Sequence, residues 1–392
     1  AASDVYKRQY FDNAATSFPK PEIVYEKLDE AMREFAANPG RSGHKLSLKM
    51  DRAIFNSRMN IQEFVGGTNP LNLIFTLNCT DSLNMAIKGL VKKGDHVITT
   101  SLEHNSVLRP LHKMQEDGFI DLTVVYADER GILDVKKVEE AITDKTRVCV
   151  TTAMSNLTGT IVDFCKIGEI MHAHDILYIV DAAQAMGYLD FDMKNMPIDV
   201  LCFPGHKSLF GPMGTGAMYI KEGIDVKSLK QGGTGSHSQD LEQPDEYPDR
   251  LEAGTINGPA IYALSAGVDF IKQEGLKNIR DHENSLKDRF INGLKDEKGI
   301  TLYGSLDEHQ GPVVPVNVEG IGSSQLAYIL DDKYDIATRA GIHCAPLAHK
   351  TIHTQDIGAV RFSFGHFNTK EEVDKAIEAL KEINRGDKDG AI

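Results

Sequence analysis

Two polar side chains follow apolar runs of the sequence and together could do covalent chemistry. One run ends at Asp181, and a later run is followed by His206 and Lys207. A lysine amine can bond to the aldehyde of pyridoxal phosphate, and a carboxylate can keep the ring nitrogen protonated so that the ring accepts electrons. A lone aspartate at a strand end is usually a helix cap, and a lone lysine is usually solvated. The pair, with Gln184 nearby, indicates a pyridoxal phosphate enzyme.

Three more polar residues lie where the sequence predicts the ends of strands. Thr80 opens a helix, so its hydroxyl and the neighbouring N–H groups could receive a phosphate at the positive helix end, although a simple cap has the same sequence. His104 follows another strand, and its flat ring could stack on a planar cofactor or merely cap a helix. Asn156 could serve oxygen atoms of substrate or cofactor, or make a turn.

One cysteine differs from the others in its surroundings. Cys344 lies in a loop-like segment with Gly341 and Pro346, flanked by His343 and near Arg339. Positive neighbours can hold part of a thiol as thiolate, which makes Cys344 the candidate nucleophile. Cys149 and Cys202 lie in predicted apolar strands and Cys165 lies in a predicted helix, so these three are expected to be small core residues.

Arg361 interrupts an apolar, strand-like run. A buried cation without a partner is unfavourable, so this guanidinium needs an anion. A substrate carboxylate gripped by the planar guanidinium fork would supply one, and a structural Asp or Glu is the alternative.

Length and composition set the limits within which these residues must be placed. A chain of 392 residues predicts two domains. The net charge of −14 disfavours nucleic acid as a partner, and no apolar run reaches the length of a membrane span. Five scattered cysteines without a CxxC pair argue against disulfides and zinc and favour the cytoplasm.

Seven apolar, β-rich runs alternate with helix-length amphipathic patterns over the first part of the chain. They cover 71–77, 96–102, 121–127, 147–155, 176–183, 199–204 and 215–220. Such alternation is typical of βαβ units in a parallel sheet. Ligands of these sheets bind outside the carboxyl ends of the strands, which is where Asp181 and Lys207 fall.

The pattern changes in the second part of the chain. Residues 228–250 are rich in Gly, Ser, Asp and Pro without a period, which predicts a long loop. Helices are then expected at 261–274, 278–295, 323–331 and 370–384, with short strands near 300–303, 313–318 and 360–364. We therefore expect a large α/β domain over 20–260 that binds the cofactor and a smaller α+β domain over 261–386 with 10–19. Residues 1–9 and 387–392 are predicted to be disordered or non-native tails.

Motifs for other chemistry are missing from the sequence. Residues 211–216 do not match GxGxxG, and the sequence holds neither GxxxxGK[ST] nor HExxH. His172 and His174 are two apart on a predicted helix and therefore face different directions. We expect no dinucleotide, P-loop or metal site.

The residues above, in their order, resemble the class V (fold type I) pyridoxal phosphate enzymes, specifically the cysteine desulfurase/selenocysteine lyase family. The likeness spans nearly the whole chain, and the matching segments are 10–16, 41–44, 103–105, 155–156, 180–184, 205–207, 252–255 and 339–344, ending at Arg361. Each segment is weak evidence by itself, but the ordered set is specific. The resemblance implies a fold type I transferase architecture, with a large, mostly parallel seven-stranded sheet domain and a smaller α+β C-terminal domain.

The resemblance also assigns roles to residues. It implies that Lys207 bonds to the cofactor aldehyde, His104 stacks on the ring, Asp181 pairs with the ring nitrogen and Gln184 bonds the phenolic oxygen. The phosphate would be held by Thr80 and His206, with Thr255 reaching it from the other subunit of a homodimer. The substrate carboxylate would be oriented by Asn156 and Arg361, with His44 and Arg339 as further lining.

The implied reaction removes sulfur from L-cysteine. Cys344 attacks the substrate sulfur and carries it as a persulfide to an acceptor protein or a reductant, and alanine is released. The segment from Cys344 to Arg361 is short, similar to the group II branch of the family rather than to the branch with a longer, mobile loop. A less mobile Cys344 implies slow turnover without an activating acceptor, or a preference for L-selenocysteine. Where many relatives have a hydroxyl residue two before the His-Lys pair, this chain has Pro204, so one phosphate contact is expected to be lost.

Other functions remain open at this point. A selenocysteine lyase, another β-lyase or a class V aminotransferase would use the same scaffold, although an aminotransferase leaves the surroundings of Cys344 unexplained. A protein of a different class, which keeps the fold and only binds a partner, is disfavoured by Lys207, Asp181 and Cys344 together.

Overall fold

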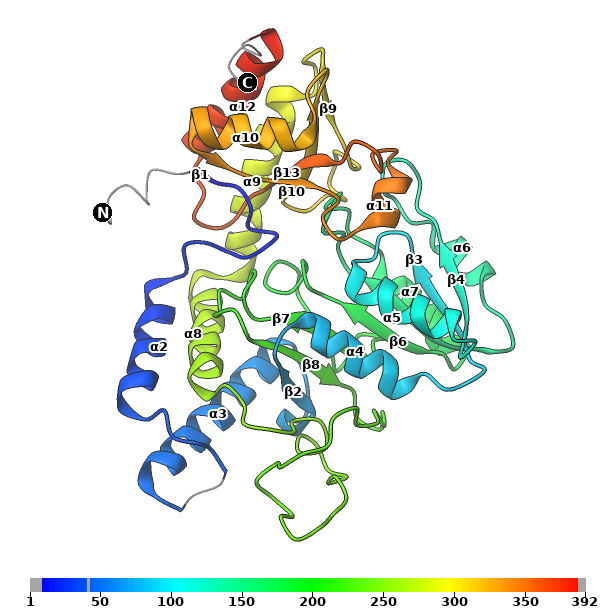
Figure 1. The fold of residues 1–392 in the computed structure, drawn as a ribbon, viewed down its shortest axis with the longest axis vertical. Coiled ribbons are helices and arrows are strands. Elements are labelled where there is room, and N and C mark those ends of the chain that lie inside the picture. The colour runs from blue at the N-terminus through cyan, green and yellow to red at the C-terminus, as the bar shows by residue number, and fades with distance from the viewer. Residues whose placement is uncertain (1–8, 41–42, 387–392) are drawn as a thin grey trace.

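The computed structural model describes residues 9–40 and 43–386. Figure 1 shows a large sheet with its helices in the lower part of the molecule and a smaller sheet with its helices above it. The predicted tails 1–8 and 387–392, and Arg41 and Ser42 of the family-like segment 41–44, lie outside the described residues. Gln9, which we assigned to the first tail, instead forms strand β1 (Gln9–Tyr10) with β11 (Ile336–Ala337).

All seven predicted strands form one sheet. In the order β2-β8-β7-β6-β5-β3-β4, only β8 runs antiparallel to its neighbours, so the prediction of a mostly parallel seven-stranded sheet is confirmed. The strands are β2 (Leu73–Thr76), β3 (His96–Thr100), β4 (Asp121–Val125), β5 (Thr146–Thr152), β6 (Leu177–Asp181), β7 (Val200–Pro204) and β8 (Gly216–Ile220).

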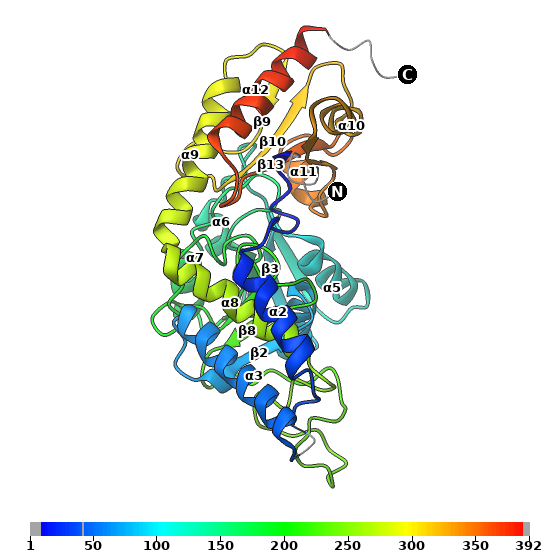
Figure 2. The same ribbon diagram turned by 90° about the vertical axis from the view of Figure 1, so that its left-hand side faces the viewer.

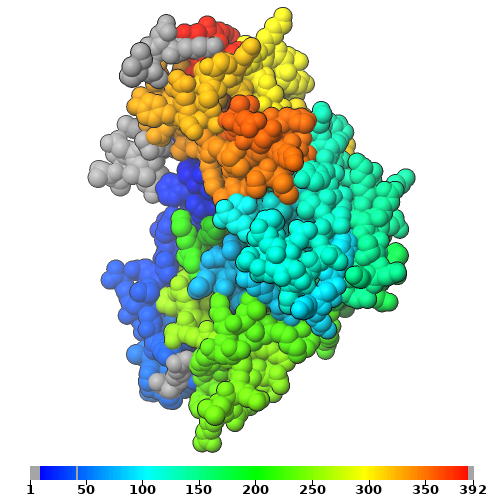
Figure 3. Space-filling model, turned by 45° about the vertical axis from the view of Figure 1, so that its right-hand side comes forward, coloured from blue at the N-terminus to red at the C-terminus, as the bar shows by residue number. Residues whose placement is uncertain are grey.

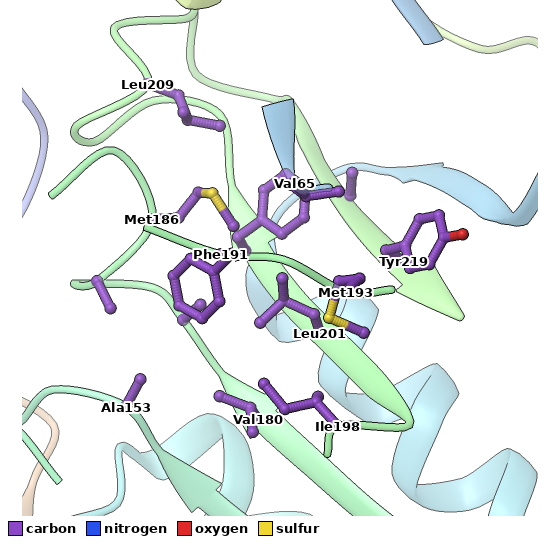
Figure 4. Packing of buried hydrophobic residues seen from close by; sticks show 14 of the residues in the cluster. Val65, Ala153, Val180, Met186, Phe191, Met193, Ile198, Leu201, Leu209 and Tyr219 are labelled. Carbon is purple, nitrogen blue, oxygen red and sulfur yellow. The ribbon is translucent and has the colours of Figure 1, made fainter. Parts of the chain in front are cut away.

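Apolar residues cover both faces of this sheet because successive strand residues point to opposite sides. Tyr178 and Val180 of β6 face one hydrophobic cluster, while Ile179 between them faces another. Figure 4 shows the first cluster, with Val180 and Leu201 of neighbouring strands beneath Phe191. A sheet buried on both faces keeps its strand ends in fixed positions.

Helices cover the two faces. One face packs against α4 (Cys79–Leu90) and α5 (Asn105–Glu116). The other packs against helices that include α3 (Lys45–Phe64), α7 (Phe164–Ala173) and α8 (Gly258–Glu274). The remaining helices around this sheet are α2 (Glu22–Glu34), α6 (Val135–Glu140) and the short 3-10 turn η1 (Pro70–Asn72).

The second sheet is antiparallel and has the order β12-β13-β10-β9. The helices and strands predicted for this part of the chain are present, with bounds shifted by a few residues. They are α9 (Leu276–Leu294), β9 (Ile300–Leu302), β10 (Val313–Val318), α10 (Ser323–Tyr334), β13 (Ala359–Ser363) and α12 (Lys370–Arg385). Three elements were not predicted, strands β11 (Ile336–Ala337) and β12 (Arg339–Gly341) and helix α11 (Pro346–Thr351), because two to six residues are too few to show a period.

The domain boundary at 260/261 stays a prediction. It falls inside α8, whose Ile261 and Leu264 lie in the core of the large sheet. Figure 2 shows α8 beside α2 and α3, and α9 continuing along the molecule toward the smaller sheet. Between β8 and α8 the chain, including 228–250, forms a loop without helix or strand, as predicted. None of the helices described is both long and apolar enough to cross a membrane.

Candidate active site

A cavity of about 190 Å³ opens at the carboxyl ends of the parallel strands. This is the edge at which sheets of this kind bind their ligands. The cavity brings together nine of the predicted site residues: Thr80, His104, Asn156, Asp181, Gln184, His206, Lys207, Arg339 and Arg361. Their convergence from distant parts of the chain is the main structural evidence for a functional site.

Asp181 and Lys207 both line this cavity; Asp181 is the last residue of β6, and Lys207 follows β7. The carboxylate of Asp181 is buried, and its Oδ1 accepts a hydrogen bond from Ala183 N at 2.8 Å. Burial lowers the pKa of Lys207 to about 8, an effect that Asp181 opposes and Arg361 increases. Burial likewise raises the pKa of Asp181, while the Ala183 N–H and Lys207 oppose the rise. The lysine can therefore exchange a proton near neutral pH.

Cys79 also touches Asp181. It is the first residue of α4, lines the cavity, and its Sγ lies 3.5 Å from Asp181 Oδ1. A thiol is a weak donor, so this contact orients the carboxylate more than it stabilises its charge. Burial and the neighbouring Asp181 raise the pKa of Cys79, so its thiol stays protonated.

The N-terminal segment fixes the backbone that carries Lys207. The carbonyl oxygen of His206 accepts from Thr16 Oγ1 at 3.0 Å and from Lys20 Nζ at 2.6 Å. Ser17 Oγ donates to Lys207 O at 2.8 Å and accepts from Lys20 Nζ at 2.7 Å. Burial lowers the pKa of Lys20 to about 8. Ser17 and Lys20 together thus hold the carbonyl groups of His206 and Lys207, and we call this pair the clamp.

Two groups that line the cavity suit an anion. Thr80 lies in the first turn of α4, whose N-cap Asn78 accepts from Asp81 N at 2.9 Å, so the positive end of that helix faces the site. His206 Nδ1 is buried and has no hydrogen-bond partner among the described residues. Burial and the nearby lysines lower the pKa of His206 to about 4, so its ring is neutral. Pro204 lines the cavity here and offers neither N–H nor hydroxyl.

His104 both caps a helix and lines the cavity, so the two alternatives considered for it are compatible. Its Nδ1 accepts from Ser106 N at 3.1 Å at the start of α5. Burial, then Lys207 and nearby arginines, lower the pKa of His104 to about 4. A neutral ring that accepts at Nδ1 carries its proton on Nε2.

Arg361 has an acidic partner from its own chain. Its Nη2 donates to Asp12 Oδ1 at 2.8 Å and its Nη1 to Asn156 O at 2.9 Å, while the buried Nε has no partner among the described residues. The structural acidic partner, the alternative to a substrate carboxylate, is therefore present as Asp12. Nε is still without a partner in the described part of the chain and could bind an anion. The role of Arg361 toward a substrate carboxylate stays a prediction.

The side-chain amides of Asn156 and Gln184 each donate one hydrogen bond to a backbone carbonyl. Asn156 Nδ2 donates to His343 O at 2.8 Å, which leaves the buried Oδ1, an acceptor, without a partner within the described part of the chain. Gln184 Nε2 donates to Ala14 O at 2.9 Å. As placed, Asn156 offers the cavity an acceptor, so binding a carboxylate would require its amide to turn over.

Three predicted residues lie outside the cavity lining. Cys344 is exposed, and its Sγ is 3.9 Å from Nη2 of Arg339, which does line the cavity. His44 caps α3 by accepting from Ser47 N at 3.2 Å. Thr255 lines two separate hollows beside Glu252. The roles of His44 and Thr255 at the site stay predictions.

Several residues of the site received no role from the sequence. They include Asp12, Ala14, Thr16, Ser17, Lys20 and Cys79. Asp12 and Ala14 lie in the family-like segment 10–16, which was a usable signal. Lys20 and Cys79 follow no pattern that separates them from an exposed lysine and a core cysteine.

Known proteins resemble this chain over nearly its whole length. The family model described as Aminotransferase class-V matches residues 9–376. A probable cysteine desulfurase of Pyrococcus abyssi is 36% identical over 387 residues, covering 95% of this chain and 94% of the relative. One of Methanothermobacter thermautotrophicus is 32% identical over 381 residues, covering 95% and 94%. The apo structure of a cysteine desulfurase from Thermococcus onnurineus NA1 superposes with a TM-score of 0.91 at 33% identity, covering 97% of this chain and 96% of that one.

The clamp on His206 and Lys207 predicts an effect on cofactor affinity. Replacing Lys20 by Met removes the ammonium that bonds to His206 O and Ser17 Oγ. Because hydrogen bonds from charged donors contribute about 1.5–3 kcal/mol, we expect pyridoxal phosphate, the cofactor predicted from the sequence, to bind about tenfold more weakly or worse. An absorbance titration of the cofactor-free protein measures the Kd. The surface change Lys27→Met is the control, and equal affinities for both variants would show that the clamp does not position Lys207.

Proposed function

Because the chain belongs to the class V aminotransferase family, we propose that it is a cysteine desulfurase. It converts L-cysteine to L-alanine and keeps the sulfur as a persulfide on Cys344. The observation that carries this proposal is the joint placement of Lys207 and Asp181 in one cavity, with Arg339 linking the cavity to an exposed thiol.

We propose pyridoxal phosphate as the cofactor, and the residues present fit it. His206 Nδ1 and Asn156 Oδ1 are buried polar atoms at the cavity without partners among the residues described. Lys207 would hold the aldehyde carbon, Asp181 the ring nitrogen, and Thr80 with His206 the phosphate. Bound pyridoxal phosphate would draw electrons from the α-carbon of the substrate and so weaken the bonds around it.

Lys207 then serves as the group that moves the proton of the α-carbon. With a pKa of about 8, its amine is populated in both protonation states near neutral pH. A base is most effective when its pKa lies close to the working pH. The clamp formed by Ser17 and Lys20 holds the backbone of Lys207 while Nζ exchanges this proton.

His104 and Arg361 orient the reactants. His104 is neutral, because its pKa is lowered to about 4, so its ring can lie against a planar cofactor without adding a charge. Arg361 is held by Asp12 and Asn156 O, while its Nε has no partner among the described residues, and its guanidinium would attract an anion such as the substrate carboxylate.

Cys344 performs the sulfur transfer. Its thiolate attacks the sulfur of bound L-cysteine, and an S–S bond forms as the bond between the β-carbon and that sulfur breaks. The electron pair left on the β-carbon takes up a proton and yields alanine. The Arg339 guanidinium lies 3.9 Å from Sγ, close enough to stabilise the negative charge that the sulfur carries during transfer.

Several finer features are part of the same proposal. Thr255 would complete the phosphate site of a second copy of the chain, which makes the active form a homodimer. The persulfide would pass to a sulfur-acceptor protein. Five free cysteines, all within the described residues, support a reducing cytoplasmic location.

The proposed function predicts that sulfur loss from L-cysteine depends on Cys344. We expect the Cys344→Ser variant to form alanine at least about 100-fold more slowly, because serine cannot accept sulfur. Alanine release measures turnover, and mass spectrometry of the wild-type protein after incubation with L-cysteine should find one extra sulfur on Cys344. Cys165→Ser, at a half-buried helix position, is the control. Alanine formation at the wild-type rate by Cys344→Ser, or retained activity only toward L-selenocysteine, would favour a lyase.

The lowered pKa of Lys207 predicts a pH dependence of cofactor capture. Only the neutral amine attacks an aldehyde, and its fraction rises with pH until the pKa of about 8 is passed, well below the ordinary 10.5. The capture rate of pyridoxal phosphate by the cofactor-free protein should therefore rise about tenfold per pH unit at low pH and level off above about pH 8. Stopped-flow absorbance measures this rate, with Nα-acetyl-lysine correcting for the titration of the cofactor itself. A rate that still rises at pH 10 would contradict the lowered pKa.

A further inference from the structure

The backbone at Cys344 has an unfavourable conformation. His343 and Cys344 have φ angles of 53° and 54°, in the left-handed region that favours glycine. Residues with a side chain rarely adopt this conformation, because Cβ comes too close to the following carbonyl oxygen. Consecutive non-glycine residues keep this conformation only when their surroundings hold them, and such strain is concentrated at functional sites.

Hydrogen bonds from the large sheet hold the two carbonyl groups of this turn. His343 O accepts from Asn156 Nδ2 at 2.8 Å, and Cys344 O accepts from Asn105 N at 2.8 Å. Asn156 follows β5 and Asn105 begins α5. Figure 3 shows the surface of this part of the chain, in orange, lying against the cyan surface of the segment around residue 105.

The ring of His343 holds the turn from the other side. Its Nε2 lies 2.9 Å from Arg339 O, and because a carbonyl oxygen only accepts, Nε2 must be the donor. In a neutral ring Nδ1 is then an acceptor, and it lies 3.2 Å from His349 Nε2. The planes of the two rings are nearly parallel, with an angle of 9° between them.

His349 continues the chain of hydrogen bonds. Since its Nε2 donates to His343, its Nδ1 must accept, and Thr354 Oγ1 lies 2.7 Å away to donate. His349 is 0% exposed and His343 is 3% exposed. Burial lowers the pKa of His343 to about 3 and that of His349 to about 4, so both rings are neutral. The hydrogen bonds from His349 through His343 to Arg339 O therefore run in one direction, and Thr354 Oγ1 lies near both Nδ1 and the carbonyl oxygen of His349.

This chain of hydrogen bonds ends at the residue that contacts the thiol. Arg339 O accepts from His343, and Nη2 of the same arginine lies 3.9 Å from Cys344 Sγ. The His343 ring therefore joins the two backbone positions from which the guanidinium and the thiol extend. A shift of the ring would move Sγ relative to Arg339 and to the cavity that Arg339 lines.

We propose that His343 and His349 are positioning residues that hold Cys344 in its left-handed backbone conformation, with Sγ beside Arg339 at the edge of the cavity. The proposal rests on the proposed function, in which Cys344 receives sulfur. Neither histidine lines the cavity, and both act through the backbone of residues 339–344. Their removal should slow sulfur transfer to Cys344 and leave the chemistry at Lys207 intact.

The test compares two changes at His349 in the protein loaded with pyridoxal phosphate. His349→Phe keeps a flat ring but has no ring nitrogen, and we expect persulfide formation on Cys344 in a single turnover with L-cysteine to slow by about tenfold or more. His349→Gln retains an amide donor for His343 Nδ1 and should recover to within about threefold of the wild type. The absorbance of the bound cofactor, and its change on adding L-cysteine, should be unchanged in both. The exposed His353→Asn is the control.

Several outcomes would overturn the proposal. One is persulfide formation at the wild-type rate in His349→Phe, and another is an equal defect in the Phe and Gln variants. A changed cofactor spectrum alongside the lost persulfide would also overturn it. If His349→Phe does not fold, His343→Asn replaces it, because asparagine suits the left-handed backbone but cannot bond both Arg339 O and His349; a wild-type rate there overturns the proposal. Wild-type protein that forms no persulfide on Cys344 would instead refute the proposed function.

Discussion

The site depends on a lysine amine that burial keeps from being fully charged. Lys207 ends in a cavity that also holds Arg361 and Arg339, with Asp181 as the carboxylate beside it. Sheet geometry brings these groups together, because the parallel strands β6 and β7 end at the same edge. A proton at Nζ is therefore weakly held, and the same excess of positive charge favours the phosphate and carboxylate groups of the proposed ligands.

The N-terminal segment 10–20 connects the parts of this site. Asp12 accepts a hydrogen bond from Arg361, and Ala14 O accepts one from Gln184. Ser17 donates to Lys207 O, and Lys20 donates to His206 O. Arg361 lies on β13 of the smaller sheet, whereas Lys207 follows β7 of the larger one. One short segment thus sets the distance between the residue proposed to move the proton and the residue proposed to hold the carboxylate.

Much of the fold could be predicted from the sequence because its signals are local. Each strand of the large sheet is an apolar run ended by polar residues, and Asp181, His104 and Asn156 could be placed at strand ends for that reason. Contacts between distant residues could not be predicted in this way. Asp12 and Arg361 are 349 positions apart, and no local pattern links them. The short β12 was mistaken for loop, and the bonds of His343 to His349 depend on a turn whose left-handed backbone leaves no mark on hydrophobic periodicity.

The residue to which the proposed cofactor attaches can be identified directly. The protein is incubated with pyridoxal phosphate, reduced with borohydride and digested, and the modified peptide is identified by mass spectrometry. We expect one modified residue, Lys207, because its neutral amine lies in the same cavity as Asp181. No modification, or modification at the other lysine of lowered pKa, Lys20, would contradict it.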